Sequence, residues 1–597
     1  MRRFRPSLIA GALALALSAG TASAQFTNTY IFGDSLSDGG QYGARFTTNP
    51  GLTAAMYVGQ NFGLSTTPST QGGTNFAFGG ARVTSSPGFP PTPPTANAVP
   101  ISAQVTQLLS SGPLDSNALF QIQGGANDVF TLASNPNLTP AQVQAGVTQA
   151  ALDLATQAGR LRAGGAQYII VQNLPDMGKT PAAAAQGQQA QLTAIANLFN
   201  STLNGAIGAA GLQVIQFNTS ALLNEIIAQP SLYGFVNSTT PVCTTPSSIQ
   251  CTPATLRDPN GNLTWVFADG VHPTTGADLV LAQAVTSMIT GPQQMAALGE
   301  AAMGVERANW RALDGRMMSA INAKGGPGKF QAWAAYDYAS EDISGSGLSG
   351  SGDINTISVG GDVLLTDKLL AGVQFGYSEY KGDFGNDNGD FKLREPMLTF
   401  YGGFGEGPWY VGATLGVGSL DYSTTRNIRL GATTRNESGD TNGYHNIARL
   451  LGGYWLRYQN WDHGPFAKLT WEQVVVRQFS ENGNDSTALT FGQQEVDTFL
   501  SSIGWQVTGN VSGFRPFARA TWEYNFDGDT RQVSARANGL NGTYLVPGFE
   551  QDDNWWLFDL GVSREFGGVT GFLSGNASAG KGDGDYWALT LGIRVPL

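Results

Sequence analysis

The C-terminal half of the chain alternates apolar and polar residues with a period of two. In the last segment one face would carry Trp587, Leu589, Leu591, Ile593, Val595 and Leu597, and the other Ala588, Thr590, Gly592, Arg594 and Pro596. Side chains of a strand point alternately to opposite faces, so one face suits lipid and the other a polar lumen. Similar segments, rich in Tyr, Trp, Phe and Gly, recur from Phe330 onward. The pattern predicts a C-terminal half built from strands.

The alternation predicts twelve strands. They lie near residues 330–340, 354–365, 368–381, 390–403, 408–422, 445–458, 464–479, 496–509, 514–526, 554–566, 569–580 and 585–597. An even number suits a closed, antiparallel transmembrane β-barrel over residues 330–597. A large soluble β-sandwich or barrel is the alternative, because its strands alternate too. The aromatic strand ends, the apolar last strand and the N-terminal leader favour the membrane barrel.

The leader is a short apolar run behind a basic start. Arg2, Arg3 and Arg5 precede LIAGALALALSAG, which ends in ASA. This order predicts a secretory signal peptide over residues 1–24, cleaved after Ala24. The apolar run is too short to span a membrane as a helix, and no other run of the chain is long enough either.

Composition narrows the classes of function. The net charge of −12 speaks against nucleic acid, which requires a basic face. With three histidines and no carboxylate loop of calcium-binding pattern, we expect no metal site. The two cysteines, Cys243 and Cys251, flank a loop-like segment. An oxidising compartment favours a local disulfide between them, and two free thiols are the alternative.

Residues 25–288 have a different texture, in which short apolar runs alternate with Ala-rich helical stretches. We expect strands in ALFQIQGG (118–125), QYIIVQNLP (167–175) and LQVIQFN (212–218), long helices between them, and a further helix in TTGADLVLAQAVTSMI. Strand and helix in turn predict a parallel sheet with helices on both faces. This α/β half is expected to form the first domain of the mature chain.

A linker of residues 289–329 joins the two halves. Its segment from Met295 to Ala323 is rich in helix formers and would extend ~40 Å as a helix, close to the thickness of a bilayer. Its many Ala and Gly residues and its interspersed charges suit a narrow polar lumen, so we predict a helix that threads the barrel. An ordinary interdomain helix is the alternative.

A candidate nucleophile follows the first expected strand. In TYIFGDSL, Gly33 ends the strand and Ser35 lies just beyond it, where α/β proteins place their chemistry. An Asp/Ser helix cap is the plain alternative. A serine nucleophile needs a base, and the α/β half contains a single histidine, His272, three residues after Asp269. That spacing allows the carboxylate to hold one ring nitrogen and leave the other for the serine.

Ester cleavage also needs donors for the developing oxyanion. Gly80 in NFAFGGAR offers an uncrowded backbone N–H, and Asn127 in GGAND offers a side-chain amide. Either signal alone is weak, because turns rich in Gly, Asn and Asp are common.

Four blocks in order, GDSL (33–36), NFAFGGA (75–81), GAND (125–128) and DGVHP (269–273), resemble the GDSL or SGNH hydrolase family. The resemblance implies a flavodoxin-like, three-layer α/β fold with Ser35 as nucleophile, His272 as base and Asp269 as its orienter. It further implies an oxyanion hole formed by the Ser35 N–H, Gly80 and Asn127. NLPDMGKTP (173–181) is similar to a further block of the family, and we assign Asp176 no catalytic role.

The C-terminal half resembles autotransporter translocators, and the pairing of the halves resembles the GDSL esterase autotransporters of Gram-negative outer membranes. The resemblance implies a monomeric serine esterase or lipase on the cell surface, anchored by its barrel and acting on acyl or lipid esters without a cofactor. Its partners would be ester substrate, outer-membrane lipid and the assembly machinery. An inactive binding or adhesion module and an acyltransferase with the same triad are the alternatives. The terminal RVPL departs from the aromatic end of many such barrels and bears on assembly more than on fold.

Overall fold

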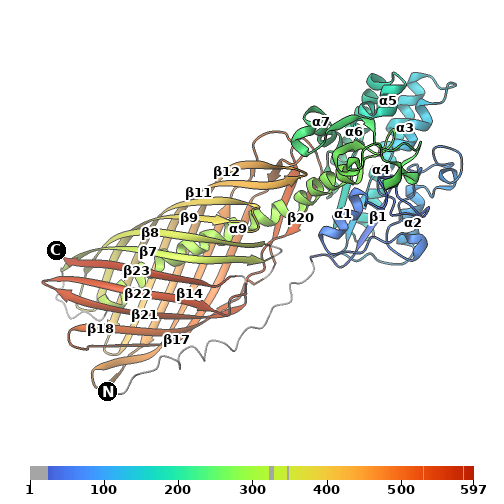
Figure 1. The fold of residues 1–597 in the computed structure, drawn as a ribbon. Helices are drawn as coiled ribbons and strands as arrows, with labels where there is room; N and C mark the ends of the chain where they lie inside the picture. Colours follow the sequence, from blue (N-terminus) through green and yellow to red (C-terminus); the bar gives the residue numbers. More distant parts are fainter. Residues whose placement is uncertain (1–24, 322–327, 346–347, 529, 583) are drawn as a thin grey trace, which may run out of the picture.

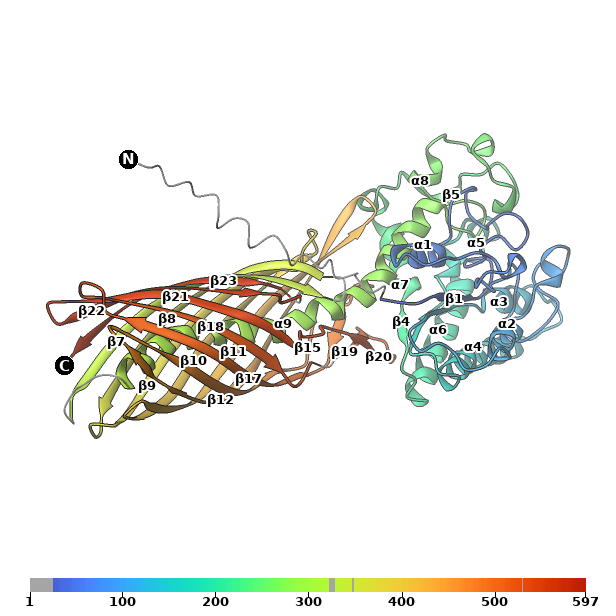
Figure 2. The ribbon, with the colours of Figure 1, turned by 90° about the horizontal axis from the view of Figure 1, so that it is seen from below.

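The computed structural model describes residues 25–321, 328–345, 348–528, 530–582 and 584–597. The expected signal peptide, residues 1–24, lies outside the described residues, and so does Ala323 at the end of the expected pore helix. The described chain forms an α/β domain at one end of an elongated barrel, and one long helix passes from the domain into the barrel (Figures 1 and 2).

The α/β half is built on a parallel sheet of four strands in the order β1-β2-β3-β4. The strands are β1 (Thr29–Phe32), β2 (Leu119–Ile122), β3 (Tyr168–Gln172) and β4 (Ile215–Phe217). A separate parallel pair joins β5 (Asn237–Pro241) to β6 (Trp265–Phe267). The helices are α1 (Ala54–Asn61), α2 (Ile101–Leu109), α3 (Ala126–Ala133), α4 (Pro140–Ala163), α5 (Pro181–Ala185), α6 (Gln189–Ala209), α7 (Thr219–Ala228), α8 (Gly261–Thr264) and the start of α9 (Thr275–Ile321).

Helices cover both faces of this sheet, which confirms the predicted three-layer arrangement. One core packs α2, α4 and α6 on one face, through residues such as Leu154 and Phe199. The other core packs α1, α7 and α9 on the opposite face, through residues such as Val58 and Val285. Because both faces are covered, β2 and β3 are buried along their whole length.

Twelve antiparallel strands of the described chain close the predicted barrel. They are β7 (Phe330–Gly345), β8 (Leu348–Leu364), β9 (Leu369–Asp383), β10 (Gly389–Glu406), β11 (Trp409–Leu430), β12 (Thr433–Tyr454), β14 (Trp461–Val476), β17 (Gln494–Gly509), β18 (Phe514–Asn525), β21 (Asn554–Phe566), β22 (Val569–Ala579) and β23 (Tyr586–Pro596). Closure comes from the pairing of β23 with β7 and of β12 with β14.

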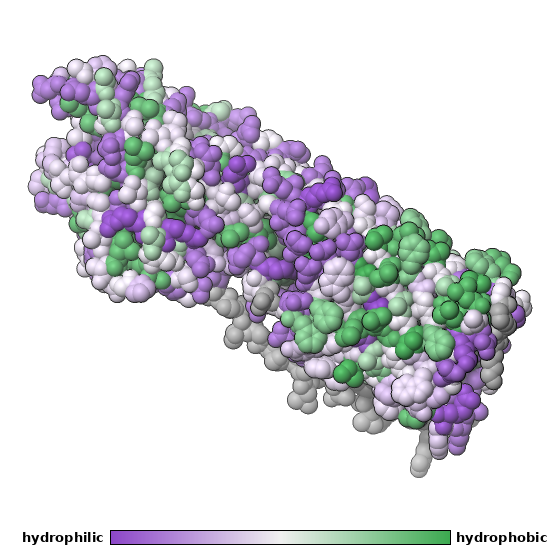
Figure 3. Space-filling model, turned by 180° about the vertical axis from the view of Figure 1, so that it is seen from behind, coloured by the Kyte–Doolittle hydropathy of each residue, from purple (hydrophilic) through white to green (hydrophobic). Residues whose placement is uncertain are grey.

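The predicted alternation of faces is confirmed on β23. Leu589, Leu591 and Ile593 are about half exposed on the outside, whereas Ala588 and Thr590 are buried on the inside. Figure 3 shows hydrophobic side chains gathered on the part of the barrel away from the α/β domain. A more hydrophilic zone separates this apolar band from the α/β domain. The apolar band is the lipid-facing surface of the barrel.

Two strands extend well beyond their predicted ends. We expected strands at 408–422 and 445–458, but β11 and β12 remain paired residue by residue up to the turn at Gly431. Ile428 and Leu430 of the extension are buried in the core around α9. The rest of the extension is largely polar, because it rises above the apolar band and needs no side that faces lipid. At the other end, β13 (Leu456–Tyr458) is a separate short strand.

A second sheet at the outer end of the barrel was not predicted. It joins β15 (Phe479–Ser480), β16 (Leu489–Phe491), β19 (Gln532–Ala537) and β20 (Thr543–Pro547). These strands have two to six residues, too few for the alternation to be recognised in the sequence.

This sheet and the β11–β12 hairpin hold the α/β domain against the barrel. The Val214 N–H donates to the Thr543 carbonyl at 3.1 Å, which links the start of β4 to β20. Glu225 on α7 accepts hydrogen bonds from Arg435 of the hairpin at 2.7 Å and from the Ser486 N–H at 2.8 Å. The two halves therefore meet through specific contacts in addition to their shared helix.

The shared helix, α9, corrects the helix boundaries expected from the sequence. The helix expected before residue 289 and the helix expected from Met295 are one helix of 47 residues, with Pro292 inside it. Proline has no N–H, so the Met288 carbonyl four residues earlier lacks its usual helical donor. The Tyr544 hydroxyl, from β20, donates to that carbonyl at 2.6 Å. A side chain distant in sequence thus replaces the missing helical bond.

Inside the barrel, charged side chains attach α9 to the wall. Arg311 pairs with Asp337 on β7 at 2.6 Å, and Glu306 pairs with Arg449 on β12 at 2.9 Å. Beside α9, the lumen of the barrel contains a cavity of about 1290 Å³ that is lined by charged and aromatic side chains. Among the described residues, no helix has both the length and the apolar character needed to cross a membrane.

Replacing Tyr544 with phenylalanine should destabilise the protein because the buried Met288 carbonyl would lose its donor. We expect Tyr544→Phe to lower the free energy of unfolding by about 1–3 kcal/mol. Denaturant unfolding in detergent micelles, followed by tryptophan fluorescence, measures the change.

Pro292→Ala provides the matched background for this test. Alanine restores the helical N–H to Met288, so Tyr544→Phe should then cost less than about 1 kcal/mol. Equal costs in the two backgrounds would contradict the role given to Tyr544.

Candidate active site

Ser35 lies in the turn that follows β1, at the carboxyl end of the sheet. Gly33 approaches Gln123 so closely that an added Cβ would lie 2.7 Å from the Gln123 amide nitrogen. Asp34 accepts a hydrogen bond from Gln123 Nε2 at 2.8 Å and from the Leu36 N–H at 3.1 Å. These contacts fix the turn of Ser35 against the segment that follows β2.

His272 lies between Ser35 and Asp269. Its Nε2 is 2.9 Å from Ser35 Oγ, and its Nδ1 is 2.8 Å from Asp269 Oδ2. Ser35 is about 9% exposed and Asp269 is 4% exposed, so the chain of hydrogen bonds runs from a buried carboxylate to a slightly exposed hydroxyl. The structure brings together the three residues that the sequence suggested, although Ser35 and His272 are 237 positions apart.

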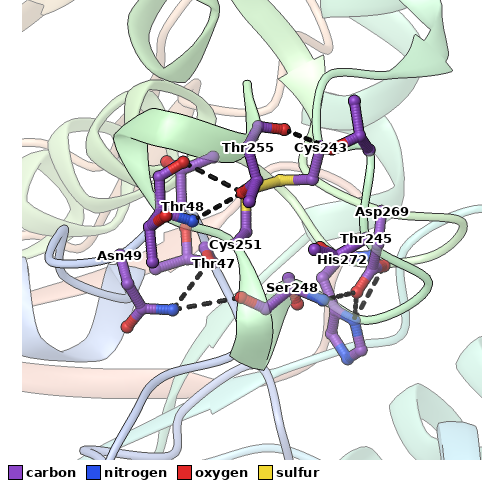
Figure 4. The surroundings of a disulfide bond; sticks show 12 residues. Thr47, Thr48, Asn49, Cys243, Thr245, Ser248, Cys251, Thr255, Asp269 and His272 are labelled. Atoms are coloured by element: carbon purple, nitrogen blue, oxygen red, sulfur yellow. Dashed lines mark hydrogen bonds and ion pairs between the residues drawn. A yellow bond between two sulfur atoms is a disulfide. The ribbon is translucent and has the colours of Figure 1, made fainter. Parts of the chain in front are cut away.

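Asp269 is also held by backbone N–H groups. Val271 and His272 each donate to its Oδ1 at 2.9 Å. Ser248 donates to its Oδ2 at 2.7 Å (Figure 4). Ser248 belongs to the loop closed by the Cys243–Cys251 disulfide. Sequence analysis did not identify Ser248, because a backbone donor leaves no trace in residue type.

The electrostatics of this group favour a protonatable histidine beside a charged carboxylate. Burial lowers the pKa of His272, but the Asp269 carboxylate raises it by more, so the net pKa lies above its usual value. Burial raises the pKa of Asp269, but His272 and the hydrogen bonds to Ser248 and Val271 hold it well below its usual range. Asp269 is therefore ionised at neutral pH and stabilises a proton on His272.

The two expected oxyanion donors, Gly80 and Asn127, lie next to each other. The Asn127 amide donates to the Ala81 carbonyl at 2.9 Å, next to Gly80. Asp128 accepts the Val83 N–H at 2.9 Å and pairs with Arg82 at 3.2 Å. The start of α3 is thus tied to the loop that carries Gly80.

The segment 173–181 lies beside the loop that carries His272 and holds that loop in place. Asp176 accepts hydrogen bonds from the Gly178 N–H at 3.1 Å and from the Thr193 hydroxyl at 2.6 Å. The Ala182 N–H donates to the Gly270 carbonyl at 2.9 Å, between Asp269 and His272. These contacts explain Asp176 as a structural residue that orders the loop beside the histidine.

A serine hydroxyl that hydrogen-bonds an imidazole, which in turn bonds a buried carboxylate, can be activated for attack on a carbonyl. No cluster of three or more potential metal ligands occurs in the part of the chain that the structure describes. The fold and this arrangement define the class as an α/β ester hydrolase joined to an outer-membrane β-barrel.

Comparison with known proteins gives the family. The GDSL-like Lipase/Acylhydrolase model matches residues 30–285, and the Autotransporter beta-domain model matches residues 332–576. An uncharacterized protein in the trpE-trpG intergenic region of Pseudomonas putida is 30% identical, covering 88% of this chain and 94% of its own. Lipase 1 of Photorhabdus luminescens is 24% identical, covering 98% of both chains. Esterase EstA of Pseudomonas aeruginosa is 28% identical, covering 94% of both.

The chain belongs to the family of GDSL esterase/lipase autotransporters. It is a carboxylic ester hydrolase of the outer membrane with its α/β domain on the cell surface, and it acts on ester or lipid substrates. The enzymatic interpretation is favoured over an inactive binding module.

The pH dependence of activity should follow His272. An imidazole accepts a proton only in its neutral form, so with His272 as the base for Ser35, kcat/KM should fall as the pH drops through the pKa of His272. Because the net shift is upward, this acid limb should lie above about 6.5, the ordinary histidine value. A pH–rate profile with a soluble short-chain ester measures it.

Asp269→Asn should move the acid limb to lower pH, because burial would then act without the opposing carboxylate. It should also reduce the maximal rate by roughly 10⁴-fold. Asp115→Asn, at an exposed carboxylate, should change neither property. An acid limb unmoved in Asp269→Asn would contradict the assignment of the limb to His272.

Proposed function

We propose that Ser35, His272 and Asp269 are the catalytic triad of this ester hydrolase. The 2.9 Å contact between Ser35 Oγ and His272 Nε2 carries the proposal. The Ser35 N–H, the Gly80 N–H and the Asn127 amide are proposed to stabilise the oxyanion. Supporting this, neither the Ser35 nor the Gly80 N–H has a hydrogen-bond partner among the described residues.

Acylation begins when Ser35 Oγ attacks the ester carbonyl carbon while its proton passes to His272 Nε2. The carbonyl oxygen becomes an oxyanion that accepts hydrogen bonds from the three donors. As the tetrahedral intermediate collapses, the bond to the alkoxy group breaks and His272 returns the proton to the leaving alcohol. An acyl group remains on Ser35.

Deacylation repeats these steps with water. His272 takes a proton from a water molecule as its oxygen attacks the acyl carbonyl, and the proton then passes to Ser35 Oγ as the acid is released. An acceptor alcohol in place of water would give acyl transfer. Products formed from a p-nitrophenyl ester with and without added alcohol distinguish the two outcomes.

We further propose the division of the chain into a signal peptide (1–24), a passenger (25–288), a linker with the pore helix (289–329) and a translocator barrel (330–597). The protein is proposed to act as a monomer that meets the outer-membrane assembly machinery during export. The substrates are proposed to be acyl or lipid esters, and a screen of esters of graded chain length would define their length.

Ser35→Ala should abolish ester hydrolysis while the protein remains folded and exported, because only binding and the oxyanion donors remain. Ser201→Ala is the matched control, since Ser201 is exposed on α6 and, among the described residues, its hydroxyl bonds only the Leu198 carbonyl. The proposal fails if Ser35→Ala keeps a turnover close to that of Ser201→Ala.

Protease added to intact cells should digest or release the passenger and spare a membrane-embedded fragment that contains Trp587. The expectation follows from the passenger lying beyond the apolar band and the barrel lying within it. Immunoblots with antibodies against each half measure the products. A passenger that is digested only after the outer membrane is opened would contradict the display proposed here.

A further inference from the structure

The turn of residues 79–81 has nearly all of its backbone groups occupied. The Gly79 N–H donates to Asp38 at 2.7 Å, and the Gly79 carbonyl accepts from the Tyr42 hydroxyl at 2.9 Å. The Gly80 carbonyl accepts from the Phe89 N–H at 2.9 Å. The Ala81 N–H donates to the Phe78 carbonyl at 3.0 Å, and the Ala81 carbonyl accepts from Asn127. Among the described residues, only the Gly80 N–H of this turn is left without a partner.

The free N–H and the carbonyl bound by Tyr42 belong to the same peptide unit. The peptide between Gly79 and Gly80 is planar, and in its trans form the carbonyl and the N–H point in opposite directions. A hydrogen bond that fixes the Gly79 carbonyl therefore fixes the direction of the Gly80 N–H. A donor on the carbonyl also polarises the unit, which strengthens the N–H as a donor.

We propose that Tyr42 is a positioning residue for ester hydrolysis, which aims and strengthens the Gly80 N–H toward the oxyanion through its bond to the Gly79 carbonyl. The proposal rests on the proposed roles of Ser35 and Gly80. Tyr42 itself touches no reacting atom.

The surroundings of Tyr42 suit this task. Its ring lies edge-on to Phe46 and Phe78, with centroids 6.2 Å and 6.1 Å away. Phe46 is buried, with its centroid 5.1 Å from that of His272, and it packs where a Cβ on Gly79 would lie. The segment of Tyr42 and Phe46 thus contacts both the oxyanion turn and the base.

The chemistry of the phenol agrees with a donor role. Burial raises the pKa of Tyr42, and the nearby Asp38 carboxylate raises it further. The hydroxyl therefore keeps its proton at every pH at which the enzyme would work. Gly80 has a φ of +83°, and an added Cβ would lie 2.7 Å from the Phe89 carbonyl, so glycine is needed for this turn.

Tyr42→Phe tests the proposal because it removes only the hydroxyl. We expect kcat to fall about 5- to 20-fold, as for one lost hydrogen bond, with KM changed by less than about twofold. The affinity for a trifluoromethyl ketone, whose adduct with the serine carries an oxyanion, should fall by the same factor as kcat/KM. The acid limb set by His272 should not move, whereas a general loosening of the site that also displaced His272 would shift it.

Tyr233→Phe is the matched control, since the Tyr233 hydroxyl accepts from Arg435 at 2.8 Å, away from the site. It should leave kcat and ketone affinity unchanged. Unchanged kcat in Tyr42→Phe, or a rise in KM alone, would overturn the proposal. Ser35→Ala is assayed in parallel: if it retains activity the triad assignment fails, whereas if it is inactive and Tyr42→Phe is unaffected only the role of Tyr42 fails.

Discussion

The structure depends on one helix remaining continuous from the α/β domain into the barrel. A helix bond missing at a buried proline is costly, because the carbonyl left behind has no water to replace its donor. Here Tyr544 supplies the donor to Met288, and Tyr422 on β11 donates to the Leu298 carbonyl at 2.8 Å, ten residues further along. Strands of the C-terminal half therefore provide hydroxyl donors to backbone carbonyls of the helix, and α9 can serve as a core element of both halves.

Within the α/β domain, the site is organised by buried carboxylates that accept backbone N–H groups. Asp34 holds the turn of Ser35, Asp38 holds Gly79, Asp128 holds Val83, and Asp269 holds Ser248 and the segment of His272. Each of these bonds is charge-assisted when its carboxylate is ionised, and each joins a loop to its neighbour or to itself. The loops at the end of the sheet are thereby connected into a single unit around the hydroxyl of Ser35.

Much of the fold and of the candidate site could be predicted from the sequence because the signals for them are local patterns of residues. The period of two located the barrel strands, and the residue types of Ser35, Asp269 and His272 identified a group that the structure places within hydrogen-bond distance. The failures have a common cause. Tyr544 donates to the carbonyl left free by a proline 252 positions away in sequence. Strands β15, β16, β19 and β20 are too short to show a period, and Ser248 and Tyr42 act through the backbone. Such contacts depend on three-dimensional proximity, which one sequence does not reveal.

The separation of Ser35 from His272 in sequence affects when the two residues can meet during export. The nucleophile lies near the free end of the passenger, whereas the base lies three residues before the helix that remains in the barrel. A chain only part of the way across the membrane has exposed one end of this pair and still holds back the other. The contact between Ser35 and His272 can therefore form only after both ends of the α/β domain have been exposed and have folded together.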